Sequence, residues 1–485
     1  MTDNASHDVV VVGGGITGLT AAYRLAEAVG KNAKLRVDLI ESDQRLGGKI
    51  VTHRVDGFLV EGGPDTWLAR KPEAAALCKE LGLEEQIIPT NQETRGAFVS
   101  RSGKLHKLPE GMSGLIPSRI APLFFSSMLS PLGRLRAAGE WFVPRREAEM
   151  DESVAGFVRR RLGSEAYDYL IEPLLCGIYG GDGDQLSLDA VAPNLKAMEQ
   201  EHGSILRGMR LSRRGSVQEV PPYPTPFISL ESGMQELVDA LERPLGNRVR
   251  VLLYTDVIGF RRVEDGDAGR GRGRLALELS NGESITTAAA ILATPANVAA
   301  NLVDSVNADL AANLRSIPFV SNAAVSLGFR EADVPRDLNG YGYVVPRRVG
   351  SQTLACSWAT SKLPGRAPAG HVLTRVFLGR SGQDIADATA DDELVDLARA
   401  ELQSTLGVAQ KPLFAHVDRY SPGMPQYTLG HLERVDRIEK LAGETPGVFL
   451  AGNSYRGVGI SDCIRSGRKA AFAALRYLGE EEPVY

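Results

Sequence analysis

The sequence predicts an α/β protein, α+β when the whole chain is considered, in which one nucleotide-binding domain is assembled from separated segments. Near the N-terminus, a short apolar and β-branched run at residues 8–12 leads directly into glycines and then into a helical pattern. Near the C-terminus, the apolar run at residues 448–451 is again followed by a glycine-rich turn and a helical pattern over residues 462–477. Between these ends the pattern changes from mostly helical to mostly strand, which predicts further domains inserted between them.

A strand–helix–strand unit opens the chain, with a helix predicted over residues 17–29 and a second strand over residues 35–41. The turn before the helix has the G-x-G-x-x-G pattern of a Rossmann-like dinucleotide site. Its glycines permit a tight turn, a close approach to a pyrophosphate and close packing of helix on strand. The phosphates would lie at the helix N-terminus, where free N–H groups favour anions. The turn consists of Gly13, Gly14, Gly15, Ile16, Thr17 and Gly18.

Three further features indicate a long cofactor such as FAD. Glu41 ends the second strand 23 residues after Gly18, where a carboxylate can bind both ribose hydroxyls and would repel the 2′-phosphate of NADP. Adjacent glycines then recur at residues 47–48 and 62–63, flanked by charged side chains. A mononucleotide would not need three glycine loops, whereas an extended dinucleotide would.

The middle of the chain predicts two other textures. A helix is expected at residues 72–83, strand and turn at 98–108, and mostly helix over 118–208. The run Arg159-Arg160-Arg161 is interleaved with acidic residues, so we expect a solvated helix face there. A helix at 232–245, strands at 248–255 and 291–295, and a polar hairpin tip at 265–274 follow. Strands dominate residues 323–378, which predicts an antiparallel sheet packed beside the first domain.

Composition excludes several classes of protein. The chain has 485 residues and a net charge of −5, which argues against a nucleic-acid binder held by bulk charge. Its four cysteines show no CxxC spacing, so we expect neither a zinc ribbon nor a disulfide scaffold, and a reducing compartment fits. We expect no signal peptide and no membrane-spanning helix, because no suitable apolar stretch occurs. The seven histidines are scattered, and we expect no metal site and no nucleophilic triad.

Beyond these patterns, the chain resembles FAD-dependent oxidases of the amine oxidase and protoporphyrinogen oxidase superfamily. The resemblance rests on the N-terminal glycine fingerprint, the E-S-x-x-R-x-G-G-K run at residues 41–49, the GGPD run at 62–65 and the flavin motif at 451–464. A finer resemblance, to the porphyrinogen oxidases of haem synthesis, rests on residues 173–182, 340–346, 425–431 and 457–464. It extends over about residues 8–475.

The resemblance implies three domains. A Rossmann-like FAD-binding domain would comprise residues 1–88, 228–300 and 440–485, and a mixed-sheet substrate domain residues 89–108 and 301–439. Residues 109–227 would form a helical domain that associates with membranes in some members. Besides the N-terminal turn, the implied FAD contacts are Glu41, Ser42, Gly48, Lys49, Gly62, Gly63, Pro64, Asp65, Thr66, Val257, Val458, Gly459 and Ile460.

The implied reaction is the six-electron oxidation of a porphyrinogen to a porphyrin, with flavin as oxidant, O2 as acceptor and H2O2 as product. We expect non-covalent FAD, because no Cys or His lies in the C-terminal turn before Cys463. Arg95 occupies the position that binds a substrate propionate in the family. The implied pocket walls are Gly177, Gly180, Tyr341, Gly342, Val344 and Phe377.

Two residues carry expectations of their own. Strand side chains alternate with period two, so if Phe377 faces the pocket, Arg375 does too and can bind a second carboxylate. We expect His431 to be structural rather than a base.

The substrate choice stays open between two porphyrinogens. The Arg70-Lys71 pair, the 173–179 run and the moderate hydrophobicity of residues 120–132 favour coproporphyrinogen III over protoporphyrinogen IX. An amine oxidase, a carotenoid desaturase-like enzyme and a flavin-binding protein without activity are the other classes. We expect a cytoplasmic protein that contacts the cytoplasmic membrane at most peripherally, and the sequence does not indicate its oligomeric state.

Overall fold

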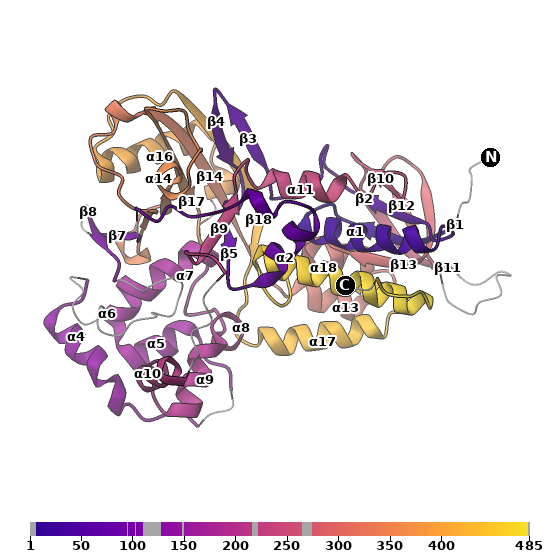
Figure 1. Ribbon diagram of the computed structural model, residues 1–485. Helices are drawn as coiled ribbons and strands as arrows, with labels where there is room; N and C mark the ends of the chain where they lie inside the picture. Colours follow the sequence, from indigo (N-terminus) through magenta and orange to yellow (C-terminus); the bar gives the residue numbers. More distant parts are fainter. Residues whose placement is uncertain are drawn as a thin grey trace.

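The computed structural model describes residues 6–94, 96–101, 103–109, 128–147, 150–215, 222–263, 274–383 and 385–483. These residues form two large sheets, each covered by helices, and a separate group of helices that we call the helical layer. Figure 1 shows the first sheet on the right, the second sheet at the upper left and the helical layer below it.

The first sheet has the order β10-β2-β1-β13-β12-β11, with β19 paired to β13. Pairs among β10, β2, β1, β13 and β19 are parallel, and β11–β12–β13 is antiparallel. Its strands come from both ends and the middle of the chain, which confirms the discontinuous α/β fold. Their bounds are β1 (Ser6–Val12), β2 (Val37–Ile40), β10 (Val249–Leu252), β11 (Val257–Val263), β12 (Arg274–Leu279), β13 (Ser284–Leu292) and β19 (Val448–Leu450).

Helices cover both faces of the first sheet, because alternate side chains of β1 point to opposite sides. Val9 and Val11 pack with α1 (Ile16–Lys31), α2 (Pro72–Glu80), α11 (Gln235–Glu242) and α18 (Ile460–Leu478). Val10 and Val12 pack with α12 (Ala296–Val303), α13 (Ala308–Arg315) and α17 (His431–Gly443). Packing against this sheet therefore continues past residue 300, where the sequence places the end of the segment.

The second sheet has the order β18-β14-β17-β16-β15-β7-β8. The strands of residues 323–378 pair antiparallel with one another, as the strand pattern predicted. The parallel β15–β7 pair makes the whole sheet mixed, as the resemblance implied. The long β18 (Phe414–Pro425) and the helix α16 (Asp391–Leu406) were not predicted. The other elements are β7 (Phe98–Arg101), β8 (Lys104–Lys107), β14 (Phe319–Arg330), β15 (Gly342–Val344), β16 (Thr353–Trp358), α14 (Ala359–Lys362), β17 (His371–Leu378) and α15 (Ile385–Ala388).

In the helical layer, the prediction that residues 159–161 form a solvated helix face is partly wrong. Arg161 of α5 is fully buried and binds Glu140 and Glu199, whereas Arg159 of the same helix is half-exposed and pairs with Asp184. The arginine run is therefore partly a buried ion-pair network, since a buried charge must be paired. The layer contains α4 (Pro131–Ala138), η2 (Gly139–Phe142), α5 (Val154–Leu162), α6 (Ser164–Ala166), η3 (Tyr167–Ile171), α7 (Glu172–Tyr179), α8 (Leu188–Val191), α9 (Pro193–His202) and α10 (Ile205–Gly215).

Small elements connect these layers. The hairpin of β3 (Thr52–Val55) and β4 (Phe58–Glu61) projects beside the second sheet, and β5 (Trp67–Leu68) pairs with β9 (Phe227–Leu230), which also pairs with β6 (Ile87–Pro89). Short helical turns are η1 (Glu84–Gln86), η4 (Glu331–Asp333) and η5 (Arg347–Val349). Across the described segments, every helix is too short or too polar to cross a bilayer. The polar tip predicted at residues 265–274 lies outside the described residues, apart from Arg274 at the start of β12.

Candidate functional site

The N-terminal glycine turn connects β1 to α1, as the sequence predicted. A Cβ on Gly18 would lie 1.8 Å from the carbonyl oxygen of Gly13, so α1 packs this closely on β1 only because residue 18 is glycine. Gly13 itself has a φ of +99°, which favours glycine. Around Gly15, by contrast, no described atom lies within 4 Å of where a Cβ would stand. Gly15 is the N-cap of α1, and the first turn, beginning with Ile16 and Thr17, contains no acidic residue, so this helix end suits an anion.

Glu41 fastens the end of β2 to this turn. Its Oε2 accepts a hydrogen bond from the Gly14 amide at 2.6 Å, and its Oε1 accepts one from the Asp43 amide at 2.9 Å. The exposed Ser42 hydroxyl also lies 3.2 Å from Oε1. The carboxylate thus lies at the edge of the turn, next to the helix end that suits an anion.

The segment before β11 passes beside Glu41. The Thr255 amide donates to the Glu41 carbonyl at 3.0 Å, and β11 begins two residues later with Val257. Val257 is half-buried and lies two residues after Thr255, whose amide contacts Glu41, the residue predicted to bind the ribose.

The second glycine loop lies directly on the first. The Gly47 amide donates to the Gly14 carbonyl at 2.9 Å, and a Cβ on Gly48 would lie 3.2 Å from the Gly15 Cα. Arg45 holds the loop in shape by donating to three of its carbonyls, those of Leu46, Gly48 and Ile50. Because this guanidinium is engaged with the backbone, Arg45 supports the loop rather than offering a free cation.

Lys49 follows the second glycine loop and directs its ammonium to β18. Its ammonium donates to the Gly423 carbonyl, and burial lowers the pKa of this side chain. A Cβ on Gly63 would lie 1.8 Å from the Lys49 carbonyl, so the two loops touch through backbone. A desolvated ammonium in this position would be stabilised by a bound anion.

The third loop is held by cations from β17 and α14. Arg375 of β17 donates to the carbonyls of Gly62 and Gly63 at 3.0 and 2.8 Å. Asp65 accepts a 2.7 Å hydrogen bond from Lys362, and its other oxygen is 3.7 Å from Arg375. Burial alone would raise the pKa of Asp65, but Lys362 and Arg375 outweigh it and lower the pKa to about 2.

Two other predicted residues complete this loop. The Thr66 hydroxyl donates to Asp65 at 3.1 Å, and Pro64 is exposed between the glycines and Asp65. The loop therefore presents a fixed backbone to the second glycine loop.

The C-terminal turn brings a second helix N-terminus to the first sheet. Gly457 has a φ of +131°, and Gly459 is the N-cap of α18, between Val458 and the first helical residue, Ile460. The carboxylate of Asp462 accepts from the Gly459 amide at 3.3 Å and pairs with Lys71.

Two buried residues that sequence reasoning left without a role in this turn support it. The Tyr427 hydroxyl donates to the Asn453 carbonyl at 2.6 Å and accepts from the Gly457 amide at 2.8 Å. His431 stacks on Tyr427, with ring centroids 4.0 Å apart, and shares a 2.8 Å hydrogen bond with the Tyr455 carbonyl. Burial lowers the pKa of His431 to about 4, so it is neutral and structural, as expected.

The residues predicted to line the substrate pocket are only partly brought together. A Cβ on Gly177 of α7 would lie 3.4 Å from Val344, and the guanidinium of Arg375 lies over the ring of Phe377 at 5.1 Å. Their shared face confirms the alternation along β17. Arg375, however, is almost fully buried and engaged with the third loop.

Two of the remaining predicted pocket residues, Gly180 and Gly342, have backbone conformations that favour glycine. A Cβ on Gly342, whose φ is +133°, would lie 2.0 Å from the Cys356 carbonyl, and Gly180 ends α7 with a φ of +61°. The Tyr341 hydroxyl donates to the Asn91 carbonyl at 3.0 Å. Arg95 lies outside the described residues.

We call the backbone at residues 13–18, 47–48, 62–63 and 457–459 the cofactor cradle. It fits a dinucleotide, because the N-terminus of α1 has no side-chain cap and no acidic residue in its first turn, the space beside Gly15 is open, and the second glycine loop continues into a desolvated ammonium, that of Lys49. A nucleotide with a single phosphate would leave most of this backbone unused.

Comparison with known proteins gives an independent view of this arrangement. Residues 16–475 match the family described as flavin containing amine oxidoreductase. The chain is 36% identical to coproporphyrinogen III oxidase of Bacillus subtilis, covering 99% of this chain and all of that one. It is 32% identical to protoporphyrinogen oxidase of Homo sapiens, covering 96% and 98%. A solved structure from Exiguobacterium sp. 255-15 superposes with a TM-score of 0.84 at 33% identity, covering 98% and 100%.

Proposed function

Because the chain belongs to the flavin-containing amine oxidoreductase family, we propose that it oxidises coproporphyrinogen III to coproporphyrin III in haem biosynthesis. The observation that carries this proposal is the end-to-end similarity to coproporphyrinogen III oxidase of Bacillus subtilis. Coproporphyrinogen III oxidases of Staphylococcus aureus and Propionibacterium freudenreichii match over 96% of this chain as well, at 32% and 35% identity.

A flavin cofactor follows from the family, and we propose that it is FAD. When bound, FAD would accept the hydride equivalents of the oxidation and pass them to O2. The six electrons and six protons removed from one porphyrinogen would reduce three O2 to three H2O2. The chain's own part is to bind and orient the cofactor and the macrocycle and to exclude water.

The contacts of the cofactor cradle support specific roles in binding FAD. The N-terminus of α1 at Gly15 and the ammonium of Lys49 would bind the pyrophosphate. Glu41, at the end of β2, would bind the adenosine ribose. The amides of residues 458–460, at the start of α18, would face the edge of the flavin ring on which negative charge develops when the flavin is reduced.

We propose that the FAD is not covalently attached. Cys463, the cysteine nearest the C-terminal turn, is buried, and burial raises its pKa to about 11. The thiol is therefore not ionised at neutral pH and is a poor nucleophile. Acid or heat denaturation should release all of the flavin into the supernatant, and flavin retained on the precipitated chain would contradict the proposal.

The direct test compares the two porphyrinogens side by side. We expect a higher kcat/KM with coproporphyrinogen III than with protoporphyrinogen IX, with anaerobic bleaching of the flavin by the preferred substrate. A preference for protoporphyrinogen IX would assign the alternative, which the human relative keeps open. Flavin reduction by amines and by neither porphyrinogen would assign an amine oxidase.

A variant at Gly177 tests the location of the substrate. Gly177→Leu would add a bulky side chain to α7 where a Cβ already touches Val344, and we expect KM to rise about tenfold or more with FAD binding unchanged. Gly139→Ala is the matched control, because the described atoms leave open space beside Gly139 in the same helical layer. An unchanged KM in Gly177→Leu would place the macrocycle elsewhere.

For Arg375 we propose a positioning role in place of the carboxylate contact that the strand pattern suggested. Its donors to the carbonyls of Gly62 and Gly63 support this role. Arg375→Lys keeps the charge and loses the planar fork, so FAD affinity should fall about tenfold with little change in KM. A raised KM with FAD affinity intact would restore the direct substrate contact, and Arg95 remains the other proposed partner for a propionate.

Peripheral membrane contact is a separate part of the proposal. Leu132 and Leu135 of α4 and Phe142 of η2 are exposed apolar side chains, and Arg134 and Arg136, which also donate to backbone carbonyls, add positive charge to the same helix. Such a surface suits an anionic lipid interface. Co-sedimentation with anionic vesicles should be lost in Leu135→Ser/Phe142→Ser, and equal sedimentation of this variant and the wild type would contradict membrane contact through this surface.

We also propose a cytoplasmic location, because the four cysteines are buried and unpaired, as a reducing compartment leaves them.

A further inference from the structure

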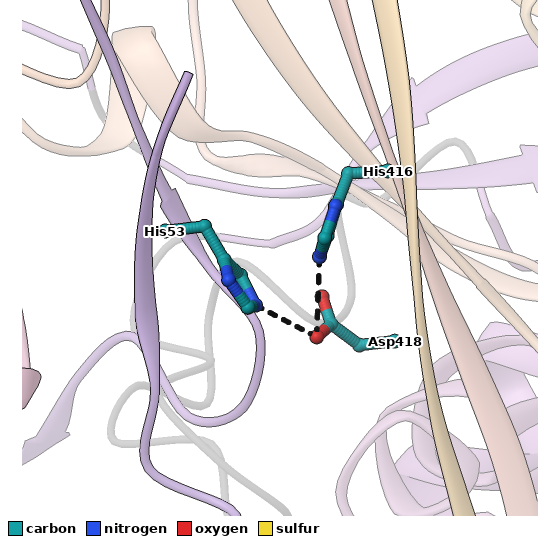
Figure 2. A group of neighbouring side chains, drawn as sticks. All are labelled: His53, His416 and Asp418. Atoms are coloured by element: carbon teal, nitrogen blue, oxygen red, sulfur yellow. Dashed lines mark hydrogen bonds and ion pairs between the residues drawn. The ribbon is translucent and has the colours of Figure 1, made fainter.

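Outside the cofactor cradle, two histidines and an aspartate converge between the β3–β4 hairpin and β18. Figure 2 shows His53, His416 and Asp418, with both imidazoles directed toward the carboxylate. The Nε2 atom of His53 lies 3.0 Å from Asp418 Oδ1, and that of His416 lies 3.6 Å from the same oxygen. The two ring centroids are 4.1 Å apart.

The topology explains why these residues meet. His416 and Asp418 are two residues apart on β18, so their side chains share one face of the strand. His53 comes from β3 and precedes Asp418 by 365 residues, which is why the histidines look scattered in the sequence. The cluster therefore bridges the hairpin that precedes the third glycine loop and the edge strand of the second sheet.

The spacing of the three potential ligand atoms is that of a metal site. With bonds of about 2.0–2.1 Å, the ligands of a tetrahedral zinc ion stand about 3.3 Å apart. The observed separations of 3.0 and 3.6 Å lie on either side of this value, and all three potential ligand atoms lie within 4.8 Å of one another. A site with two imidazoles and one carboxylate favours zinc-class ions over magnesium or calcium.

Exposure and hydrogen bonding add to this argument. The side chains of His53 and His416 are 29% and 33% exposed, so an ion and a completing water can reach them. The second oxygen of Asp418, Oδ2, is buried and has no hydrogen-bond partner in the part of the chain that the structure describes. A carboxylate held by hydrogen bonds alone would leave this oxygen uncompensated, whereas a metal ion would draw charge from the whole group.

We propose that His53, His416 and Asp418 form a binding site for one divalent transition-metal ion of the zinc class. A bound ion would connect β3 to β18 next to Gly62, because a Cβ on Gly62 would lie only 2.7 Å from Asp418 Oδ1. The ion would thus stabilise the third glycine loop of the cofactor cradle from its outer side. This role is separate from catalysis, and it requires only that the folded chain bind metal.

The test uses the FAD-loaded, full-length protein after chelator treatment and dialysis. Co²⁺ should bind at one equivalent and give d–d absorption at wavelengths longer than the flavin bands, and Zn²⁺ should displace it. His53→Gln, His416→Gln and Asp418→Asn should each lower the affinity by at least about tenfold. His106→Gln, at a histidine on β8 outside the cluster, is the matched control and should bind as the wild type does.

Thermal unfolding gives a second measurement. Zn²⁺ should raise the Tm of the wild type and of His106→Gln, because binding to the folded state alone stabilises it, and should not raise the Tm of the three variants. If Asp418→Asn does not fold, the two half-exposed histidine variants decide the outcome. No saturable Co²⁺ binding, or equal affinity in the wild type and in His53→Gln and His416→Gln, would overturn the proposal.

Discussion

The two ends of the cofactor cradle achieve the same geometry by different means. At the N-terminal end, backbone packs on backbone: Gly18 lies against the Gly13 carbonyl, and a Cβ on Gly467 of α18 would lie 2.1 Å from the Thr17 carbonyl. At the C-terminal end, the turn before α18 is held by side chains from the segment between β18 and α17 and from the first residue of α17. Tyr427 and His431 are both almost fully buried there.

The two turns therefore differ in which residues determine their conformation. The N-terminal turn depends mainly on which of its own residues lack a side chain, so its motif can be recognised in a short stretch of sequence. The C-terminal turn also depends on polar groups some 30 residues away (Tyr427 to Gly457 is 30), which must be buried and paired. Mutations should therefore act sterically at the first turn and through lost hydrogen bonds at the second.

The largest effect should come from Gly18→Ala. The added Cβ would lie 1.8 Å from backbone oxygen, so α1 must move, and we expect the cofactor-free protein to lose about 3 kcal/mol or more of unfolding free energy. Urea unfolding of the apoprotein measures this loss.

Gly15→Ala is the matched control for that variant. Its φ of −65° allows alanine and the site is open in the described structure, so apoprotein stability should not change, while FAD affinity should fall. Equal stability of the two variants would remove the steric account of the N-terminal turn.

Tyr427→Phe should have the next largest effect. The change deletes one hydroxyl and leaves the Asn453 carbonyl and the Gly457 amide without that partner, at a cost of about 2 kcal/mol. Flavin retention during gel filtration should also fall. A variant with wild-type stability and retention would show that the C-terminal turn does not need this support.

Acid sensitivity should follow from His431. Its pKa is near 4 in the folded protein and near 6.5 when unfolded, so below pH 6.5 the unfolded state binds more protons and stability falls as pH falls. Between pH 7 and about pH 5.5 the contribution is about 1 kcal/mol. His431→Gln should lose less stability than the wild type over this interval, whereas His106→Gln should lose the same amount.

The smallest effect should come from Arg456→Ala. Arg456 lies in the C-terminal turn, but its partners Asp436 and Glu439 are exposed on α17, and surface ion pairs contribute about 0.5 kcal/mol or less. A loss as large as that in Tyr427→Phe would mean that exposed pairs, rather than buried groups, hold the turn.

Local pattern was sufficient for the strand and helix that open the first sheet, whereas β11 and β12 were not predicted as strands and β13 was predicted only at its C-terminal end. The apolar run of β1, the glycines after it and the helical spacing of α1 were predicted within two residues of their observed bounds. The long β18 was missed, because its half-exposed polar residues do not alternate clearly. The arginine run was misjudged for the same kind of reason, since only the fold brings Glu140 and Glu199 around Arg161.

The sequence by itself determined the glycine turns, the family and the assembly of one sheet from both ends of the chain. These features depend on residue type at short spacing, where steric limits on the backbone act directly. Only the tertiary structure decided that Arg375 binds the third glycine loop, that Tyr427 and His431 support the C-terminal turn, and that His53 meets His416 and Asp418. Each of these contacts joins residues from different elements, and their partners depend on how the layers pack rather than on any local pattern.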